Sequence, residues 1–323
     1  MTIKSVIWIV ACAALLTGCP AWPDPIGDTT SAPAIPTTDM PTTDIPTAAS
    51  PTAGSPAPAS PAPTSPAADI LTTADPALAS PAPSAASPMP LARWVPAPGT
   101  SWQWQLTSPV DTSVDAQVYD IDGFEATPDV VRELHAQGRK VICYINAGAA
   151  EDFRPDYNVF PPQILGKSDG WDGEKWLDIR RLDVLLPIMA TRFDMCQRKG
   201  FDAVEADLAD GYANDTGFPL TAQDQLSYNR ALAGLAHERG MSIGLKNDLD
   251  QIPALLNDFD FAVNEQCAQY HECGKLTPFI QAGKAVFHVE YELETTQFCP
   301  ETTALGFSSL RKNTSLDAAR WPC

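Results

Sequence analysis

Histidine is scarce in this chain of 323 residues, which has only 4 of them, and no two cysteines are separated by two residues. A zinc site built from His and Cys clusters is therefore a weak hypothesis. No serine stands in a nucleophile elbow, the sharp turn between a strand and a helix, and neither a His-Glu-x-x-His motif nor a phosphate-binding loop is present. These absences argue against an esterase, a zinc protease and a nucleotide hydrolase.

Positive charge is also missing over a long stretch, since no Lys or Arg lies between Lys4 and Arg93. The segment from Pro20 to Pro90 consists mainly of Pro, Ala, Ser and Thr, so it has too little apolar surface to offset the entropy of ordering it. We expect residues 19–92 to form a disordered tether. Fully extended at about 3.1 Å per residue, it would reach roughly 200 Å and let an anchored domain work away from a membrane.

The apolar run near the N-terminus is too short to span a bilayer, which takes about 20 residues. It covers residues 6–16, follows Lys4 and leads through Leu-Thr-Gly to Cys19, the pattern of a bacterial lipoprotein signal peptide over residues 1–18. We expect export to the cell envelope and a lipid anchor at Cys19, which would be the protein's contact with the membrane. An ordinary secretory signal, with a secreted product, is the alternative.

Six cysteines remain when Cys12 and Cys19 are set aside, an even number in a domain expected to be exported. They are Cys143, Cys196, Cys267, Cys273, Cys299 and Cys323. Disulfides are the natural expectation, although six cysteines allow fifteen connectivities. Proximity along the chain favours the pairs 267–273 and 299–323, which leaves 143 with 196. A metal site using His271 beside Cys273 is a weaker alternative, and we expect no metal or other cofactor.

Residues 93–323 are numerous enough for one large domain, in which apolar runs alternate with helical patterns. Strands are predicted at 102–106, 116–120, 140–145, 203–206, 242–246, 261–265, 285–289 and 305–310. Helices are predicted at 128–137, 182–199, 221–239 and 251–257. Eight strands alternating with helices favour an α/β fold, the (β/α)₈ TIM barrel. An open doubly wound sheet is the alternative, but no Gly-rich dinucleotide fingerprint follows the first strand.

Polar residues, many of them acids, end the apolar runs. In the run 200–212, strand alternation places Glu205 and Asp207 on one face and leaves Asp210 in the turn, and Glu265 ends the run 259–267 in the same way. The other polar strand ends are Asp120 with Asp122, Tyr144 with Asn146, Lys246 with Asn247, and Glu290 with Tyr291. Barrel enzymes keep their chemistry at this end of the strands. We therefore expect one polar mouth.

The direction of these side chains can be checked against the cysteines. If Cys143 faces outward to meet Cys196 on the next helix, then Tyr144 and Asn146 point into the barrel. The same alternation turns Asp120 and Asp122 inward beside Ala116, and Lys246 inward beside Ser242 and Gly244. The polar groups are thus expected to collect at one end.

Several carboxylates around one mouth suit a carbohydrate, and glycoside hydrolysis needs two, a proton donor and a nucleophile or base. Asp207 and Glu265 lie two strands apart, which allows about 5 to 9 Å between their carboxyl groups and leaves the stereochemistry open. Lys246 suggests a Schiff base as an alternative. The neighbouring acids argue against it, because they favour the charged form of the amine.

A series of motifs between Trp102 and Tyr291 resembles glycoside hydrolase family 114, the endo-α-1,4-polygalactosaminidases. In order they are WQWQL, VYDIDGF, GRKVICYINAGAAEDFRPD, GFDAVEADLADGY, GLKND, FDFAVNEQC and KAVFHVEY. The resemblance implies a barrel that cleaves within α-1,4-linked galactosamine or N-acetylgalactosamine polysaccharide, with Asp207 and Glu265 as the catalytic acids. The substrate-binding residues that it implies are Asp120, Tyr144, Glu205, Asp210, Lys246, Asn247 and Glu290. Ala206 stands where we expect proline, but both flanking acids are in place.

The formal net charge is −19. This charge disfavours nucleic acid as a partner and suits a cationic polymer, such as partly deacetylated polygalactosamine. An acidic surface that only keeps an exported protein soluble explains the charge equally well. Two other hypotheses for function stay open: a non-catalytic lipoprotein that binds polysaccharide at the cell surface, and a hydrolase of a different hexosamine polymer.

Overall fold

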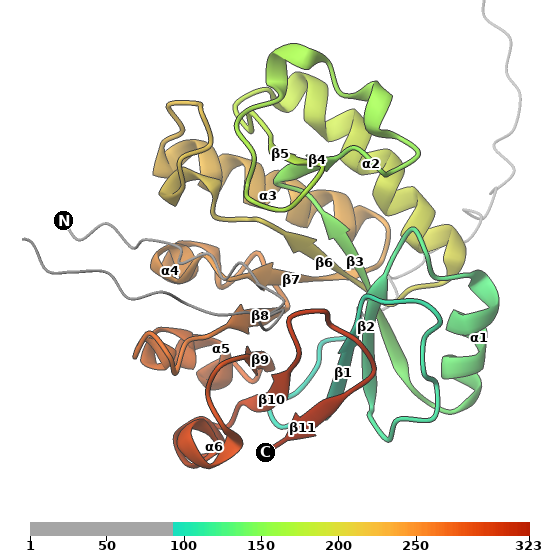
Figure 1. The fold of residues 1–323 in the computed structure, drawn as a ribbon, viewed down its shortest axis with the longest axis vertical. Coiled ribbons are helices and arrows are strands. Elements are labelled where there is room, and N and C mark those ends of the chain that lie inside the picture. Colours follow the sequence, from blue (N-terminus) through green and yellow to red (C-terminus); the bar gives the residue numbers. More distant parts are fainter. Residues whose placement is uncertain (1–92) are drawn as a thin grey trace, which may run out of the picture. The chain divides into compact units, whose positions relative to one another are not determined.

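The computed structural model describes residues 93–323, which are coloured in Figure 1. The predicted signal peptide, the tether and Cys19 lie outside the described residues. Among residues 93–323, no helix combines the length and the apolar character needed to cross a membrane.

Eight parallel strands form the sheet on which the domain is built. In the order in which they pair, they are β1 (Trp102–Gln105), β2 (Val118–Asp122), β3 (Lys140–Asn146), β6 (Ala203–Asp207), β7 (Ser242–Lys246), β8 (Phe261–Glu265), β9 (Val286–Glu290) and β10 (Ser308–Lys312). Figure 1 shows helices around the outside of these strands. The predicted TIM barrel is confirmed.

The C-terminal segment links the first strand of the barrel to the last. Strand β11 (Arg320–Pro322) runs antiparallel to β10, and its Arg320 donates a hydrogen bond to the carbonyl of Trp102 on β1 at 2.6 Å. The indole Nε1 of Trp102 donates to the carbonyl of Ser308 on β10 at 2.9 Å. Side chains therefore bridge β1 and β10, where no ladder of backbone hydrogen bonds is formed between the described strands.

The helices between the strands begin and end largely where the sequence predicts. They are α1 (Pro128–Ala136), α2 (Leu182–Lys199), α3 (Ala222–Glu238), α4 (Ile252–Leu255), α5 (Thr277–Gln281) and α6 (Thr295–Ala304), with short 3-10 turns at Tyr157–Val159, Pro162–Ile164, Gly211–Ala213, Leu249–Gln251 and Cys273–Leu276. Thr127 caps α1 by accepting from the amide of Val130, with Pro128 at the first helical position. Gly200 ends α2 in the left-handed conformation. The sequence did not predict α5, which is short, or α6, which contains Pro300.

Strand alternation separates two apolar cores. Inside the barrel, the rings of Trp102, Trp104, Phe261 and Phe287 pack on one another. Outside it, a larger cluster fills the space between the sheet and the helices. Cys143 belongs to the outer cluster and is bonded to Cys196 on α2, so the predicted direction of this strand is correct. The disulfides Cys267–Cys273 and Cys299–Cys323 complete the pairing that proximity favoured.

A β-hairpin that the sequence did not predict lies between β3 and α2. Its strands, β4 (Ala149–Glu151) and β5 (Glu174–Trp176), are antiparallel and are joined by a long segment that contains the 3-10 turns 157–159 and 162–164. This insertion follows the C-terminal end of β3, at the end of the barrel where the polar residues were predicted (Figure 1). It therefore adds residues to the rim of the mouth.

Candidate active site

Lys246 is the positive charge around which the polar strand ends gather. Its Nζ lies 2.7 Å from Asp207 Oδ1, 2.9 Å from Glu265 Oε2 and 3.8 Å from Glu205 Oε1. Burial alone would lower the pKa of Lys246, but the charges of these acids raise it well above its ordinary value. The amine therefore stays protonated, which argues against the Schiff-base alternative.

Asp207, at the end of β6, accepts three hydrogen bonds. The donors are Lys246, the hydroxyl of Tyr144 at 2.7 Å from Oδ2, and the amide of Leu208 at 2.8 Å from Oδ1. Burial favours the neutral acid, yet the charge of Lys246 and these hydrogen bonds outweigh it and lower the pKa of Asp207 below its ordinary value. Asp207 is thus held as a carboxylate.

Glu265, at the end of β8, also contacts three donors but is more exposed. Besides Lys246, it accepts from the hydroxyl of Tyr291 through Oε1 and from Asn247 Nδ2 at 3.4 Å through Oε2. Its side chain is 25% exposed, whereas that of Asp207 is 14% exposed. Glu265 is consequently the more accessible of the two acids to a molecule entering the mouth.

The backbone turns sharply just after the strands that carry these groups. Leu208 follows Asp207, Asn247 follows Lys246 and Gln266 follows Glu265, and their φ angles are 58°, 51° and 62°. The left-handed region is costly for most residues other than glycine, less so for asparagine, and such strained residues often cluster at functional sites. Asn247 compensates by accepting from the amide of Glu265 at 3.0 Å. These turns leave the acids and the lysine at the strand tips.

Asp120 and Glu205 form a carboxyl pair deeper in the barrel. Both side chains are buried, and apart from a hydrogen bond between them their four oxygens have no hydrogen-bond partner among the described residues. Burial raises the pKa of Asp120 to about 7, and burial and the charge of Asp120 raise that of Glu205 well above its ordinary value. Two such carboxyls share a proton. Neither side chain reaches the surface, so the expectation that Asp120 and Glu205 contact a sugar does not fit their position, and Glu205 instead lies 3.8 Å from Lys246.

Two further acids predicted near the mouth lie at its rim. Asp210 is partly buried in the turn after β6, where burial raises its pKa to about 6 although Lys246 opposes the shift. Asp122 is bound by Arg154 at 2.7 Å and also accepts from the amides of Phe124 and Glu125. Asp210 is thus partly exposed, whereas Asp122 is committed to contacts within the protein.

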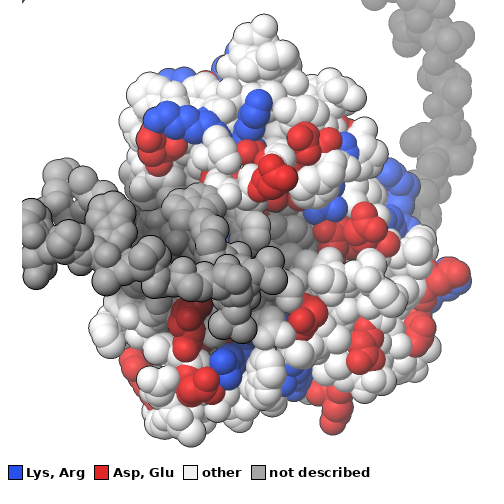
Figure 2. Space-filling model, viewed as in Figure 1, with Lys and Arg blue, Asp and Glu red and all other residues white. Residues whose placement is uncertain are grey.

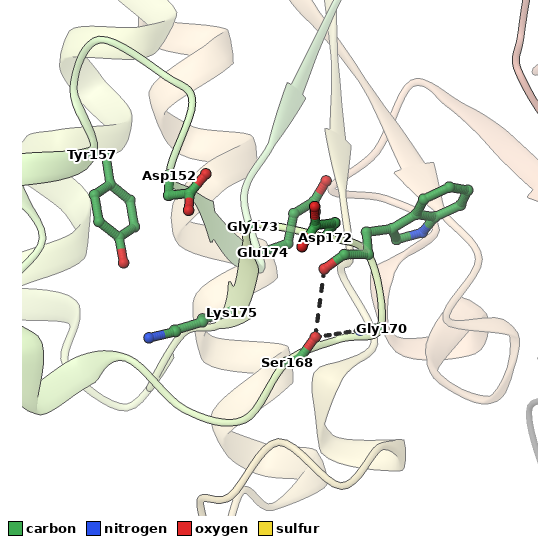
Figure 3. A pocket seen from close by; sticks show the side chains of 9 residues that line it. Asp152, Tyr157, Ser168, Gly170, Asp172, Gly173, Glu174 and Lys175 are labelled. Carbon is green, nitrogen blue, oxygen red and sulfur yellow. Dashed lines mark hydrogen bonds between the residues drawn. The ribbon is translucent and has the colours of Figure 1, made fainter.

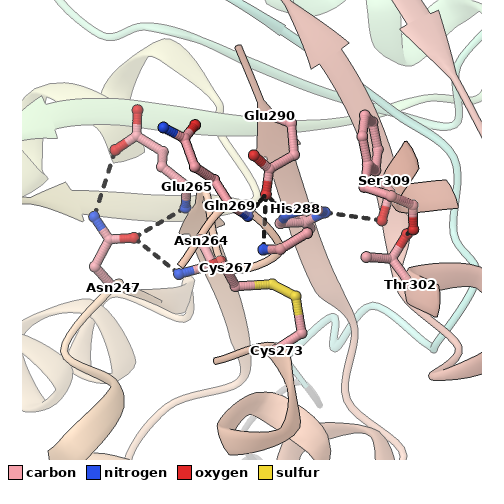
Figure 4. Close-up of a disulfide and its surroundings, with 12 residues drawn as sticks. Asn247, Asn264, Glu265, Cys267, Gln269, Cys273, His288, Glu290, Thr302 and Ser309 are labelled. Carbon is pink, nitrogen blue, oxygen red and sulfur yellow. Dashed lines mark hydrogen bonds and ion pairs between the residues drawn. A yellow bond between two sulfur atoms is a disulfide. The ribbon is translucent and has the colours of Figure 1, made fainter. Parts of the chain in front are cut away.

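Glu290 is not brought into the group around Lys246. On β9, Phe287 and Val289 belong to the inner core, so Glu290 points outward, where it accepts from the amides of Ala268 and Gln269 at 2.8 and 3.3 Å. It also contacts His288 Nε2 at 2.9 Å (Figure 4). Glu290 thus holds the loop after Glu265, and the expectation that it lines a sugar subsite does not fit this position.

Tyr291, one residue later, takes the place expected of Glu290. The sequence marks it as a polar strand end without indicating a role, and the structure brings its hydroxyl to Glu265. Trp104 is a second residue that the sequence did not assign to the site, and its ring centre lies 5.1 Å from Lys246 Nζ.

The metal alternative is not supported at the cysteines. Cys267 and Cys273 lie close to His288, but their sulfur atoms are joined in a disulfide and are not available as thiolate ligands (Figure 4).

The hairpin insertion contributes a second carboxyl pair, beside Asn146. Asn146 Nδ2 donates to Glu174 Oε2 at 3.0 Å, and Glu174 shares a hydrogen bond with Asp169. Burial, followed by the charges of Asp169 and Glu151, raises the pKa of Glu174 to about 8. No periodic pattern in the sequence marks this irregular segment, so its contact with Asn146 was not predicted.

A cavity of about 530 Å³ opens beside the tip of this hairpin. Figure 3 shows Tyr157 and Lys175 on one side of it and Ser168 and Gly170 on the other. The sequence from Gly166 to Gly170 has the spacing Gly-x-Ser-x-Gly, but Ser168 lies in an exposed loop and not between a strand and a helix. The hairpin is therefore no esterase site.

Comparison with known proteins identifies the family to which this chain belongs. The model of glycoside-hydrolase family GH114 matches residues 83–323. The crystal structure of Aspergillus fumigatus Ega3 in complex with galactosamine is 43% identical, with a TM-score of 0.69 over 73% of this chain and 100% of that chain.

Two more distant proteins are also similar. The glycoside hydrolase domain of PelA from Pseudomonas aeruginosa shares the fold at 12% identity, with a TM-score of 0.54 over 69% of this chain and 98% of that one. A Deinococcus radiodurans protein is 26% identical over 224 residues, 59% of this chain and 71% of its own length. The resemblance found in the motifs is confirmed: the chain belongs to glycoside-hydrolase family GH114 and is a glycoside hydrolase.

Proposed function

We propose that the protein is an endo-acting hydrolase of α-1,4-linked galactosamine or N-acetylgalactosamine polysaccharide. The observation that carries this proposal is the placement of Asp207 and Glu265 on one ammonium group at the C-terminal end of the barrel. The galactosamine bound to Ega3, a relative with 43% identity, supports an amino sugar as the substrate unit.

The surroundings of the two acids favour different roles. Asp207 accepts from three donors and stays ionised, as a nucleophile must. Glu265 is more exposed and is the better placed to give a proton to the glycosidic oxygen. In the first step, the bond from the anomeric carbon to this oxygen breaks while Asp207 bonds to that carbon. Water then attacks the anomeric carbon and breaks its bond to Asp207, while Glu265 removes a proton from that water.

The spacing of the acids supports this two-step course. Since both contact Lys246 Nζ, at 2.7 and 2.9 Å, the two contacting oxygens are no more than about 6 Å apart. Retaining glycosidases separate their carboxyl groups by about 5 to 5.5 Å, and inverting ones by about 6.5 to 9.5 Å. We therefore expect the α configuration to be retained.

Product analysis tests the proposal directly. Purified protein incubated with acetylated and with deacetylated galactosamine oligosaccharides is expected to give internal cleavage products by mass spectrometry. Proton NMR during the first minutes should show the new reducing end as the α anomer. Release of single terminal sugars would contradict endo action, an initial β anomer would contradict the role of Asp207 as nucleophile, and no cleavage of either polymer would contradict the substrate.

The charge of the protein agrees with a cationic substrate. Figure 2 shows Asp and Glu side chains over the visible face, with Lys and Arg among them, and the formal net charge of the chain is −19. Such a field attracts a polymer that carries free ammonium groups and repels nucleic acid.

We also propose that the protein is exported and anchored by a lipid on Cys19, because the segment before this residue has the lipoprotein pattern. Cys19→Ser is expected to move the protein from the membrane fraction to the soluble fraction of cells, because the thiol that carries the lipid is gone. Cys12→Ser is the control and should leave the protein in the membrane fraction. Membrane association that survives Cys19→Ser would contradict the anchor.

A further inference from the structure

The carboxyl pair on the hairpin lies beside the proposed nucleophile. Glu174 is bound by Asn146, and Asn146 is the register partner of Asp207 on the neighbouring strand. The charge of Asp207 contributes to raising the pKa of both Glu174 and Asp169, as expected for acids near one another. The pair therefore borders the mouth on the side of β3 and β6.

Two acids on this side of the mouth, Glu151 and Asp169, are short of hydrogen-bond donors. Glu151 faces Glu174 across the hairpin and is only 2% exposed, yet its Oε2 has no partner among the described residues. Its other oxygen accepts from Arg154, a cation that Asp122 shares. Asp169 Oδ2 likewise receives no donor except the shared proton of Glu174. Buried acceptors without donors are costly, which points to a ligand that brings donors and positive charge.

An exposed aromatic residue lies close to this pair in the chain and is bonded to it through its backbone. Trp171 is 65% exposed, more than any other large apolar side chain among the described residues, and its amide donates to Asp169 Oδ1 at 3.0 Å. A sugar ring can lie against the face of an indole, and a cation near that face gains further attraction. The hydrogen bond from the Trp171 amide to Asp169 links the position of Trp171 to that of the acid pair.

We propose that Asp169, Glu174 and Trp171 form a subsite for a positively charged amino-sugar unit, next to the unit that reacts at Asp207. The inference rests on the proposed function and adds to it the residues that recognise the ammonium group of one unit. The ammonium group takes the place of the proton shared by Asp169 and Glu174, and that proton leaves to solvent, so one proton is released for each unit bound. An N-acetylated unit carries no charge and does not displace the proton.

Several charged groups bear on this exchange. The acids near the pair are Glu151 on β4 and Asp207 on β6. The polar groups near it are Tyr144 and Asn146 on β3. Asp172 and Lys175 lie on the same hairpin, where both are exposed. Asp183 provides the control, because it is a 68% exposed acid on α2 that pairs with Arg181 and does not line the cavity beside the hairpin.

Calorimetric binding to deacetylated and to N-acetylated galactosamine oligosaccharides tests the subsite in a Glu265→Gln background, in which cleavage is slow. Glu174→Gln is expected to weaken binding of the deacetylated oligosaccharide roughly 10-fold or more and to leave the acetylated one unchanged. In buffers of different ionisation heat, the release of about one proton near pH 7 should be lost with Glu174→Gln. Trp171→Ala should weaken both oligosaccharides by a similar factor.

The outcomes separate the subsite from the proposed function. Equal effects of Glu174→Gln on both oligosaccharides, no effect on either, or the same effect from Asp183→Asn would overturn the subsite alone. If the parent protein binds neither oligosaccharide, the proposed substrate fails and the subsite fails with it. Thermal unfolding of each variant shows whether it is folded, and Asp169→Asn repeats the test at the other member of the pair.

Discussion

Asp207→Asn and Glu265→Gln are each expected to lower turnover on the polymer by roughly 10² or more, the usual scale for a general acid or base. Both changes keep the shape of the side chain and remove its ability to ionise. Asp207 is expected to fail as the nucleophile, because the amide has no negative charge with which to attack the anomeric carbon. Glu265 is expected to fail as the proton donor, so the leaving oxygen would depart as an unprotonated alkoxide.

Turnover per folded molecule, together with binding and the pH profile, checks this result. Binding should survive, because the neighbouring groups are unchanged, and loss of the acid at Glu265 should remove the alkaline limb of the profile. Asp129→Asn is the control, since this acid is 80% exposed on α1. A variant that keeps more than about a tenth of wild-type turnover would contradict the assignment, and full turnover would favour a non-catalytic role.

Lys246→Met is expected to lower turnover by a similar factor and to destabilise the domain at neutral pH. Methionine fills much of the same space but leaves Asp207, Glu265 and Glu205 without their shared cation. Removing one partner of a buried ion pair costs about 3 to 5 kcal/mol, because the remaining charge stays in a poorly solvated place. Burial would then raise the pKa of Asp207, and the acid limb of the activity profile should move to higher pH.

The pH dependence of stability tests the electrostatic explanation of this loss, because its direction can be predicted. In the wild type the pKa of Asp207 is lowered, so its contribution is present above the ordinary carboxyl pKa and is lost as the pH falls through the lowered value. In Lys246→Met the buried acids can protonate as the pH falls, which relieves their repulsion. The loss in melting temperature should therefore be large at pH 7 and smaller at pH 5. Equal losses at both pH values would contradict the electrostatic explanation.

Lys275→Met is the matched control for Lys246→Met. Its side chain is 44% exposed, and it pairs with Asp250 and Glu272 on the surface. Exposed ion pairs of this kind contribute about 0 to 1 kcal/mol. Turnover and melting temperature should change little. This result would show that the effect of Lys246→Met comes from its place between the two proposed catalytic acids and not from the loss of a lysine as such.

The sequence alone determined the barrel and the centre of its site. The alternation of apolar runs with helical patterns predicted eight strands, and the outward direction of Cys143 predicted that Tyr144 points inward, where it binds Asp207. Local patterns suffice here, because a strand repeats every two residues and a long helix every 3.6. The same reasoning predicted Lys246 and Glu265 at strand ends, where the structure joins them.

Tertiary structure decided what depended on one residue of register or on contacts distant in sequence. Glu290 and Tyr291 are consecutive, and only the pairing of β9 determines that tyrosine enters the site while Glu290 holds the outer loop. Asp120 meets Glu205 across the barrel interior, and Glu174 reaches Asn146 from an irregular hairpin. Such contacts leave no periodic trace in the sequence, because they arise when the closed barrel brings separate strand ends and loops together.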